Sequence, residues 1–439
     1  MNSKWKLCFP KTFVSRLARI NSDHCPLLLS LVPNLGQIGV KPFHFHPVWL
    51  NHDGFSNIVK EAWEGDRQNV CHAINMFANK AKIWNKEVFG NIFWKKMNLS
   101  ARLVGAEKAL ENAPSQRLIN IHNFLLGELE NILNLEEKLW GMKARTNRLI
   151  QGERNTTFFH ISTFNRRSNN QILGIRDLYG NWVTDLERVK MIFVASFKKL
   201  CSSEQIAYDR IWDHSLPFDN SLSSSEALYL SDPHSDAEIL FALNSMKAFK
   251  APRPDGIHSG FFQRFWMVVG DSVKFEVKRI FQNRKISTQL NKTLIALIPK
   301  QLGLETIGHF RLISLCNTIY KVVSKILALR MKHPMPKLIP PSQTAFIAGR
   351  KGSNNFIVAQ ELLYTLEKKK GKTGYMIIKI DLEKTYDRME WSFVRNVLCS
   401  LGFHNATVEL ILSYISSTFV SLLFNGEQFE EFQTSRRLR

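Results

Sequence analysis

The chain has 439 residues, of which 44% are hydrophobic and 11% aromatic, a composition that supplies packed cores and excludes a generally disordered protein. Lys and Arg number 59 against 38 Asp and Glu, so the formal charge is +21 and a polyanion is the expected partner. Because we find no apolar run of membrane-spanning length, no secretory signal and no C-x-x-C pair among the six cysteines, we expect an intracellular protein without a membrane span or a zinc site.

The first part of the chain is expected to be mainly helical. Residues 1–32 hold apolar clusters, and residues 33–56 are punctuated by Pro and Gly, as in a linker. Within residues 57–150 apolar residues recur at spacings of three and four, which predicts a long amphipathic helix or an antiparallel helix pair. Helix packing explains this stripe, and a coiled-coil oligomerisation scaffold is the alternative. The stripe consists of Leu118, Ile121, Leu125, Leu129, Ile132, Leu135, Leu139 and Met142.

The helical pattern breaks at "QGERNTTFFH", and residues 151–235 are expected to hold a hairpin and loops. The stretch "ILGIRDLYGNWVTD" predicts a β-hairpin that turns at Tyr179, Gly180 and Asn181. Residues 203–236 are rich in Ser and Asp and are expected to be loop-like.

Residues 236–439 have the pattern of a mixed α/β domain. The stretch "TLIALIPK" predicts a short strand that ends in Lys300, and "NTIYKVVSKILALRMK" predicts a helix. The helix should bury Ile319, Val322, Val323, Ile326 and Leu327. Its other face aligns Lys321, Lys325 and Lys332. Either a solvated basic face or contact with phosphates explains this row of lysines.

The stretch "MIIKIDLEKTYDRMEW" predicts a strand, a turn and then a helix that begins near Trp391 and stops at Gly402. The alternating strand residues Ile378, Ile380 and Leu382 predict one apolar face. Asp381 stands where the strand gives way to the loop, within reach of solvent and ligand. Mg²⁺ takes one or two such carboxylates together with substrate phosphates, whereas capping of the turn is the alternative role for this residue.

Five stretches occur together in the order and spacing of one family. They are "MKAFKAPRPDGIHSGFFQRFW", "TLIALIPK", "FRLISLCNTIYKVVSKILALRMK", "SQTAFIAGRKGSNNFIVAQELL" and "IIKIDLEKTYDRMEW". This set resembles the reverse transcriptase of a non-LTR (long interspersed) retrotransposon of the plant type, and "FNGEQFEEFQTSRRLR" extends the resemblance to the C-terminus. "LWGMKARTNRLIQGERNTTFFH" is similar to the connector of such polyproteins, and "SDHCPLLL" to the last motif of their apurinic-type endonuclease.

The resemblance implies an α+β fold. Residues 1–32 would be the C-terminal remnant of an endonuclease of the α/β sandwich type, and residues 57–150 and 151–235 a connector. Residues 236–439 would form the fingers and a partial palm of a right-hand polymerase. The implied function is RNA-directed DNA polymerase, with Mg²⁺ as cofactor and with an RNA template, target DNA and dNTP as partners.

The resemblance also assigns roles to single residues. Asp381 would bind Mg²⁺, and the ring of Tyr386 would lie under the sugar of the incoming nucleotide and exclude a 2′-hydroxyl. Lys300 and Arg311 would hold the triphosphate, and Arg350 would face the template. Lys321, Lys325 and Lys332 would contact nucleic acid. Asp387 and Lys384 would support the metal ligand from the turn, and Asp23 and His24 belong to the endonuclease motif.

Several family features are absent from this sequence. No Ala-Asp-Asp occurs, and no Asp follows Asp387, so we expect the chain to be an inactive, truncated form of the enzyme. Arg253 and Arg437 stand where the family has Gly, which is harmful if those positions need a positive φ. A nucleic-acid-binding protein without catalysis, in the nucleus or cytoplasm, is the alternative function. The oligomeric state stays open.

Overall fold

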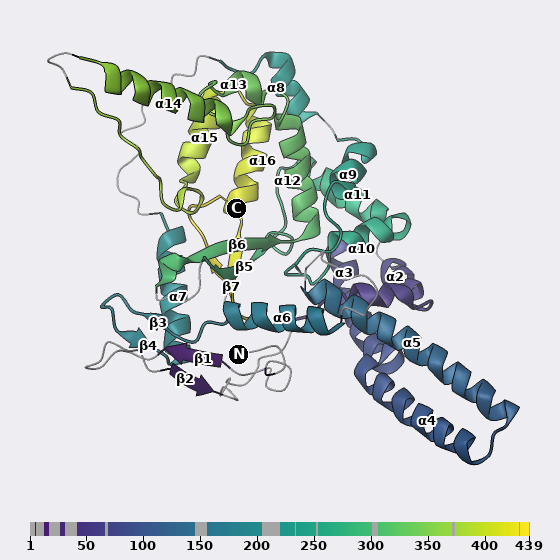
Figure 1. Cartoon of the computed structure of the whole chain (residues 1–439). Helices are drawn as coiled ribbons and strands as arrows, with labels where there is room; N and C mark the ends of the chain where they lie inside the picture. Colours follow the sequence, from purple (N-terminus) through teal and green to yellow (C-terminus); the bar gives the residue numbers. More distant parts are fainter. Residues whose placement is uncertain are drawn as a thin grey trace.

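The computed structural model describes residues 5, 13–16, 27–30, 42–65, 69–144, 156–203, 220–232, 234–251, 253–300, 306–370, 374–429 and 431–438. These residues form an α+β fold in which helices surround a five-stranded sheet (Figure 1). Of the N-terminal region, the structure describes an antiparallel pair of short strands, β1 (Phe13–Arg16) and β2 (Leu27–Ser30). Asp23 and His24 lie outside the described residues. No helix in the described part of the chain is both long and apolar enough to span a membrane.

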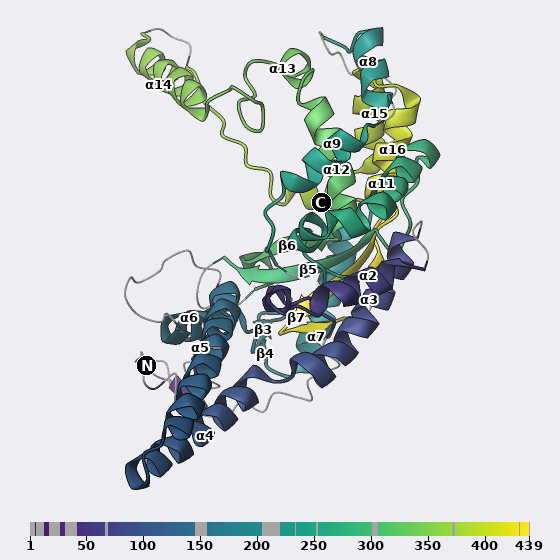
Figure 2. The same cartoon turned by 90° about the vertical axis from the view of Figure 1, so that its right-hand side faces the viewer.

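The predicted helical region is confirmed in its described part. The helices are α2 (Phe55–Trp63), α3 (Val70–Trp84), α4 (Ile92–Asn112) and α5 (Gln116–Ala144), with a short helical turn η2 at Asn85–Phe89. Within residues 33–56, which the sequence suggested as a linker, a short helical turn η1 (Pro47–Asn51) forms and Phe45 and Trp49 are buried. Helices α4 and α5 run side by side as a hairpin that projects from the body of the molecule (Figures 1 and 2). Leu125, Ile132 and Leu139 are buried at intervals of seven along α5, so these stripe residues serve helix packing within the chain, whereas Ile121 is exposed.

One aromatic core joins the N-terminal helices to the later part of the chain. The ring centroids of Phe77 and Phe261 are 4.7 Å apart, and the Trp63 indole N–H donates to the Ser272 hydroxyl at 3.0 Å. Both aromatic partners of the first pair are fully buried. The later helices of this core are α9 (Asp236–Asn244), α10 (Ser259–Arg264) and α11 (Trp266–Asn283).

The predicted hairpin is also confirmed. It follows α6 (Thr156–Asn170) and consists of β3 (Ile175–Arg176) and β4 (Trp182–Val183). The Asp177 carboxylate accepts hydrogen bonds from the backbone of Tyr179 and Asn181 at 2.9 and 2.8 Å, and Gly180 has a φ of 84°. A carboxylate that bonds to its own turn and a glycine with positive φ are typical of tight turns, so the signal for this hairpin lies within the segment itself.

The central sheet has the order β6-β5-β7-β8, and β9 pairs with β7. β5 runs parallel to β7, and the other pairs are antiparallel. Helix α7 (Leu186–Cys201) covers one face, where Phe193 and Phe197 pack with Ile295, Phe310 and Leu422. The strands are β5 (Lys292–Pro299), which confirms the predicted "TLIALIPK" strand, β6 (Phe310–Cys316), β7 (Phe419–Phe424), β8 (Glu427–Gln428) and β9 (Phe432–Gln433).

The predicted helix after β6 is α12 (Thr318–Met331), and all five residues expected to face the core are buried. Tyr320 of α12 stacks on Tyr414 of α16 with ring centroids 3.8 Å apart. The Gly402 stop is confirmed, since this residue has a φ of 80° two positions after α15 ends. The remaining helices are α13 (Met335–Leu338), α14 (Gly352–Lys368), α15 (Trp391–Ser400) and α16 (Asn405–Ser416).

Two secondary-structure predictions are wrong. Residues 203–236, expected to be loop-like, contain α8 (Ser224–Ser231). Ser223 and Glu226 form a capping box at its start, so a Ser-rich stretch that suggested a loop here begins a helix.

The predicted strand at residues 376–382 is not formed either. This segment is exposed, with Ile378 at 68% and Ile380 at 77% of full accessibility, and none of the described strands pairs with it. A strand is stable only beside a hydrogen-bonded neighbour, so alternation of apolar residues cannot by itself make one. The segment follows α14, which has no buried residue and stands apart from the sheet (Figure 2).

Candidate nucleotide and nucleic-acid interface

Two of the predicted cationic residues lie at one end of the β5–β6 pair. The backbone N–H of Lys300 donates to the His309 carbonyl at 2.9 Å, so the pairing of the strands continues past β5. Arg311 stands opposite Ile298, and residues opposite each other in an antiparallel pair share a face. Because side chains alternate along a strand, Lys300 projects on that same face. The structure therefore brings two exposed cations to one face of a strand end.

The predicted lysine row lies on α12 and at its C-terminal end. Lys332 is exposed, and Lys321 and Lys325 are half-buried. Burial, together with the nearby charges of Arg253 and Lys250, lowers the pKa of Lys321. An anion beside these cations would favour the charged form of Lys321 and raise its pKa again.

Arg350 is held by its own loop. Its guanidinium donates to the carbonyl oxygens of Pro336, Ile339, Pro340 and Gln343. These bonds fix the loop between α13 and α14 and direct the donors of Arg350 into that loop. A contact between Arg350 and a template, which the sequence suggested, therefore stays a prediction.

Asp381 is an exposed carboxylate in the extended segment before the turn. A single carboxylate fits a hard cation such as Mg²⁺, which completes its shell with water and phosphate oxygens. A two-ion centre needs carboxylates from more than one element, with the ions about 3.5–4 Å apart. Among the described residues no group of three or more His, Cys, Asp or Glu is placed to hold a metal. The described residues thus do not fit a two-metal centre, and we derive no step through Mg²⁺.

The turn that carries Tyr386 is fastened to the C-terminal residues. It forms a single helical turn at Thr385–Asp387 (η5), and the Leu438 N–H donates to the Tyr386 carbonyl at 2.7 Å. The Asp387 carboxylate lies 3.0 Å from Nε of Arg437, and their side chains are only 17% and 5% exposed. This ion pair supports the predicted role of Asp387 as an anchor of the turn. The Tyr386 ring, 58% exposed, remains open to a ligand.

The backbone angle φ differs between the two positions where this chain has Arg and the family has Gly. Arg437 has a φ of 117°, in the region that favours glycine, whereas Arg253 is not among the described residues with a positive φ. Arg253 is buried and donates to the Cys316 carbonyl at 2.8 Å and to the Ser259 hydroxyl at 2.9 Å. Lys384, predicted to support the metal ligand, opens the turn with a φ of 53°. Backbone strain is therefore expected at Arg437 and not at Arg253.

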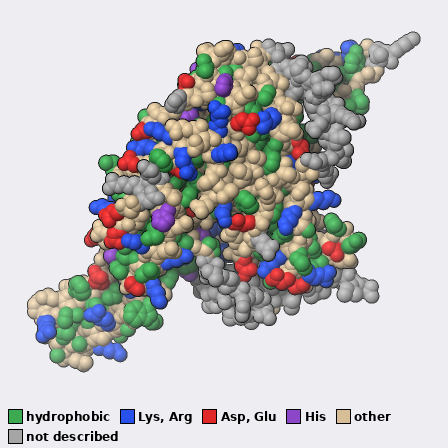
Figure 3. All heavy atoms as spheres, turned by 180° about the vertical axis from the view of Figure 1, so that it is seen from behind, with side chains coloured by type: hydrophobic (Ala, Val, Ile, Leu, Met, Phe, Trp, Pro, Cys, Tyr) green, Lys and Arg blue, Asp and Glu red, His purple; other side chains and the backbone are tan. Residues whose placement is uncertain are grey.

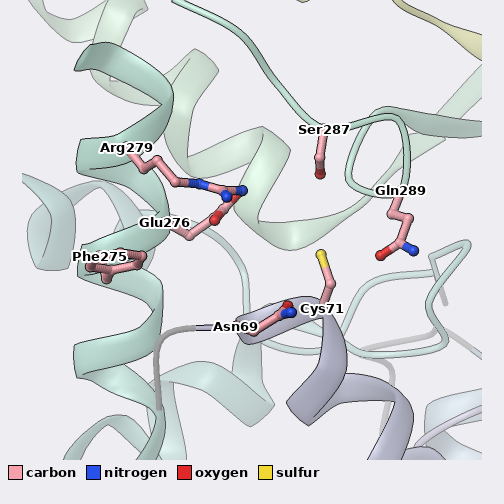
Figure 4. Close-up of a pocket in the computed structure, with 7 residues that line it drawn as sticks. All are labelled: Asn69, Cys71, Phe275, Glu276, Arg279, Ser287 and Gln289. Carbon is pink, nitrogen blue, oxygen red and sulfur yellow. The ribbon is translucent and has the colours of Figure 1, made fainter. Parts of the chain in front are cut away.

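A cavity of about 470 Å³ between α3 and α11 contains none of the predicted site residues (Figure 4). Glu276 on its wall is paired with Arg279 at 2.8 Å. Burial raises the pKa of the Cys71 thiol to about 11, so this sulfur stays protonated and is a poor nucleophile. We therefore assign no chemistry to this cavity.

Residues 298–439 match the family of reverse transcriptases, the RNA-dependent DNA polymerases. The matched segment contains Lys300, Arg311, Asp381 and Tyr386, so this part of the chain is a reverse transcriptase domain. Over 404 residues the chain is 24% identical to the transposon TX1 uncharacterized 149 kDa protein of Xenopus laevis. That match covers 88% of this chain and 30% of the length of the relative. The chain therefore contains a reverse transcriptase domain at residues 298–439 and is similar over most of its length to a transposon protein.

Proposed function

We propose that the chain binds nucleotide and nucleic acid as the fingers and the first part of the palm of an RNA-directed DNA polymerase. This proposal rests on the position of Lys300 and Arg311, which share one exposed face. Both residues lie within the segment that matches the reverse transcriptase family. Lys and Arg hold phosphates through charge-assisted hydrogen bonds, so this face would take the triphosphate of a dNTP. Tyr386 would lie under the sugar, and Asp381 would contribute one ligand to Mg²⁺.

The RNA template and the target DNA would follow the lysine row of α12. Figure 3 shows the side of the molecule that faces away from the viewer in Figure 1, and there Lys and Arg side chains are scattered rather than gathered into one patch. Such a spread favours non-specific attraction of a polyanion, while the crowded cations near Lys321 favour a fixed contact. We propose that the protein works in the nucleus or the cytoplasm, where its nucleic-acid partner would be. Residues 1–32 would be the endonuclease remnant.

We also propose that this 439-residue polypeptide binds nucleic acid without catalysing synthesis. Its support is that no group of three or more His, Cys, Asp or Glu among the described residues is placed to hold a metal, which leaves Asp381 as the one predicted ligand. The competing function is an active polymerase. In that case the further carboxylate ligands that Mg²⁺ needs besides Asp381 would come from residues that the structure does not describe. The two functions agree on binding and differ in synthesis.

Primer extension separates them. Purified protein with an RNA template, a DNA primer, Mg²⁺ and dNTPs should bind the primed template in a mobility-shift assay and leave the primer unextended. The matched control is Asp381→Asn, whose binding and background should equal those of the unmodified chain. Incorporation above background that disappears in Asp381→Asn would show an active polymerase and overturn the proposal of inactivity. Absence of binding at low salt would overturn the proposed function itself.

A further inference from the structure

A second cavity, of about 410 Å³, lies between α7, the turn at residues 384–388 and the C-terminal segment. Four cationic side chains line it, together with the apolar side chains of Phe197 and Ile307. The cations are Lys199, Lys384, Arg388 and Arg436. They come from three segments that are far apart in the sequence, so only folding brings them to one cavity.

Two carboxylates of this region are already engaged. Glu390 pairs with Arg436 at 3.3 Å, and Asp387 pairs with Arg437 at 3.0 Å. Among the described residues, the salt bridges include none that involves the other three lining cations, Lys199, Lys384 and Arg388. The cavity therefore carries a positive charge that its described protein neighbours do not balance, and an anion would balance it.

The cavity wall is fixed before any ligand arrives. Nε of Arg436 donates to the Leu200 carbonyl at 2.9 Å, and its backbone N–H donates to the Cys201 carbonyl at 3.2 Å. The turn is closed by the Asp387 N–H, which donates to the Lys384 carbonyl at 2.9 Å. Because the backbones that carry these cations are already bonded, an anion would have to order only the ends of the side chains.

This cavity is distinct from the cation pair at the end of β5. Ile307 and Phe310 pack against α7, whereas Arg311 alternates to the opposite face of β6. The α7 side of the cavity also lies outside residues 298–439, which match the reverse transcriptase family. The cavity thus combines the reverse transcriptase domain with the helix that precedes it.

We propose that this cavity is a second phosphate-binding site, which holds a phosphate group of a bound polynucleotide against α7 while the β5–β6 face takes the nucleotide. The inference rests on the proposed function in taking nucleic acid as the partner. Phosphate in this cavity can come from a polynucleotide backbone or from the tail of a nucleoside triphosphate, and the same cations would bind either. The site would couple the position of α7 to the turn that carries Tyr386.

The test uses a cavity variant of the full chain, in which Lys199, Lys384 and Arg388 are all replaced by Gln. A surface control variant loses the same charge at the exposed residues Lys60, Lys86 and Lys108. Three probes without Mg²⁺ are compared by titration: inorganic tripolyphosphate, dTTP and a 12-nucleotide RNA. We expect the cavity variant to bind tripolyphosphate and RNA about tenfold more weakly than the surface control. The slope of log K on log salt for RNA should flatten by about 0.7 for each phosphate that the cavity variant no longer neutralises.

The outcomes separate the proposals. Weaker binding of RNA by the cavity variant supports the proposed polynucleotide site. Weaker binding of dTTP with unchanged RNA binding overturns it, because the cavity would then hold the triphosphate of a nucleotide. If the two folded variants bind all three probes equally, the proposal that the cavity binds phosphate is overturned. A third outcome is that no variant, nor the unmodified chain, binds RNA, while the cavity variant still binds tripolyphosphate more weakly than the surface control. Phosphate binding in the cavity is then supported, and the proposed nucleic-acid function is overturned. Circular dichroism checks that both variants keep their helices.

Discussion

Replacement of Arg437 by Gly should lower the stability of the protein, even though glycine suits the backbone there. A φ of 117° costs a non-glycine residue about 1–2 kcal/mol, which the substitution regains. The substitution also leaves the Asp387 carboxylate, which is 17% exposed, without its partner at 3.0 Å, and loss of one member of a buried pair costs about 3–5 kcal/mol. Since the Arg437 Nε makes no well-aligned hydrogen bond, we take the lower end of this range. The net expected loss is about 2 kcal/mol.

The double variant Asp387→Asn with Arg437→Gly decides whether this reasoning holds. It has no orphaned charge and no strained arginine, so its free energy of unfolding should lie within about 1 kcal/mol of the unmodified chain. The unmodified chain, the two single variants and the double variant form a double-mutant cycle. Urea denaturation gives the free energy of unfolding of all four proteins, provided that their m-values agree. The exposed pair Arg395 and Glu409, both replaced by Gln, is the control and should show a coupling below about 0.5 kcal/mol. A coupling that small between Asp387 and Arg437, or a single variant more stable than the unmodified chain, would refute the argument.

Two further predictions concern charge. Burial lowers the pKa of His234 and of His258 to about 4, below the value of about 6.5 in an unfolded chain, so the unfolded state takes up protons first and stability falls as the pH drops from 6.5 to 4. Asp255, whose pKa burial raises to about 6, opposes this fall, because the folded state is the first to protonate there. His234→Phe keeps the stacking on Phe281 and should reduce the loss between pH 7 and 4.5 by about 2–3 kcal/mol in urea titrations, whereas an unchanged pH dependence would contradict the role of His234. Replacement of the lysine row by Gln should flatten the salt slope of RNA binding by about 2 units, and a slope equal to that of the surface control variant would remove nucleic acid from α12. The row is Lys321, Lys325 and Lys332.

The local elements of this protein could be predicted because their signals are local. The five buried residues of α12 follow the helical period, and all five face the core. The turn at Gly180 carries its own hydrogen bonds and glycine. The order and spacing of the motifs in residues 246–394 indicated a reverse transcriptase, and the family match at residues 298–439 confirms it.

The tertiary structure alone decided what depends on contacts between distant segments. The alternation at residues 376–382 predicts a strand, yet strands form only where a second strand supplies hydrogen bonds, and none of the described strands does so. The pairing of Asp387 with Arg437 and the four cations around the α7 cavity join residues that are 50 to more than 200 positions apart. Sequence periodicity reports which face of an element is apolar, but it carries no distance between elements. The charges that meet in the folded chain are set by packing.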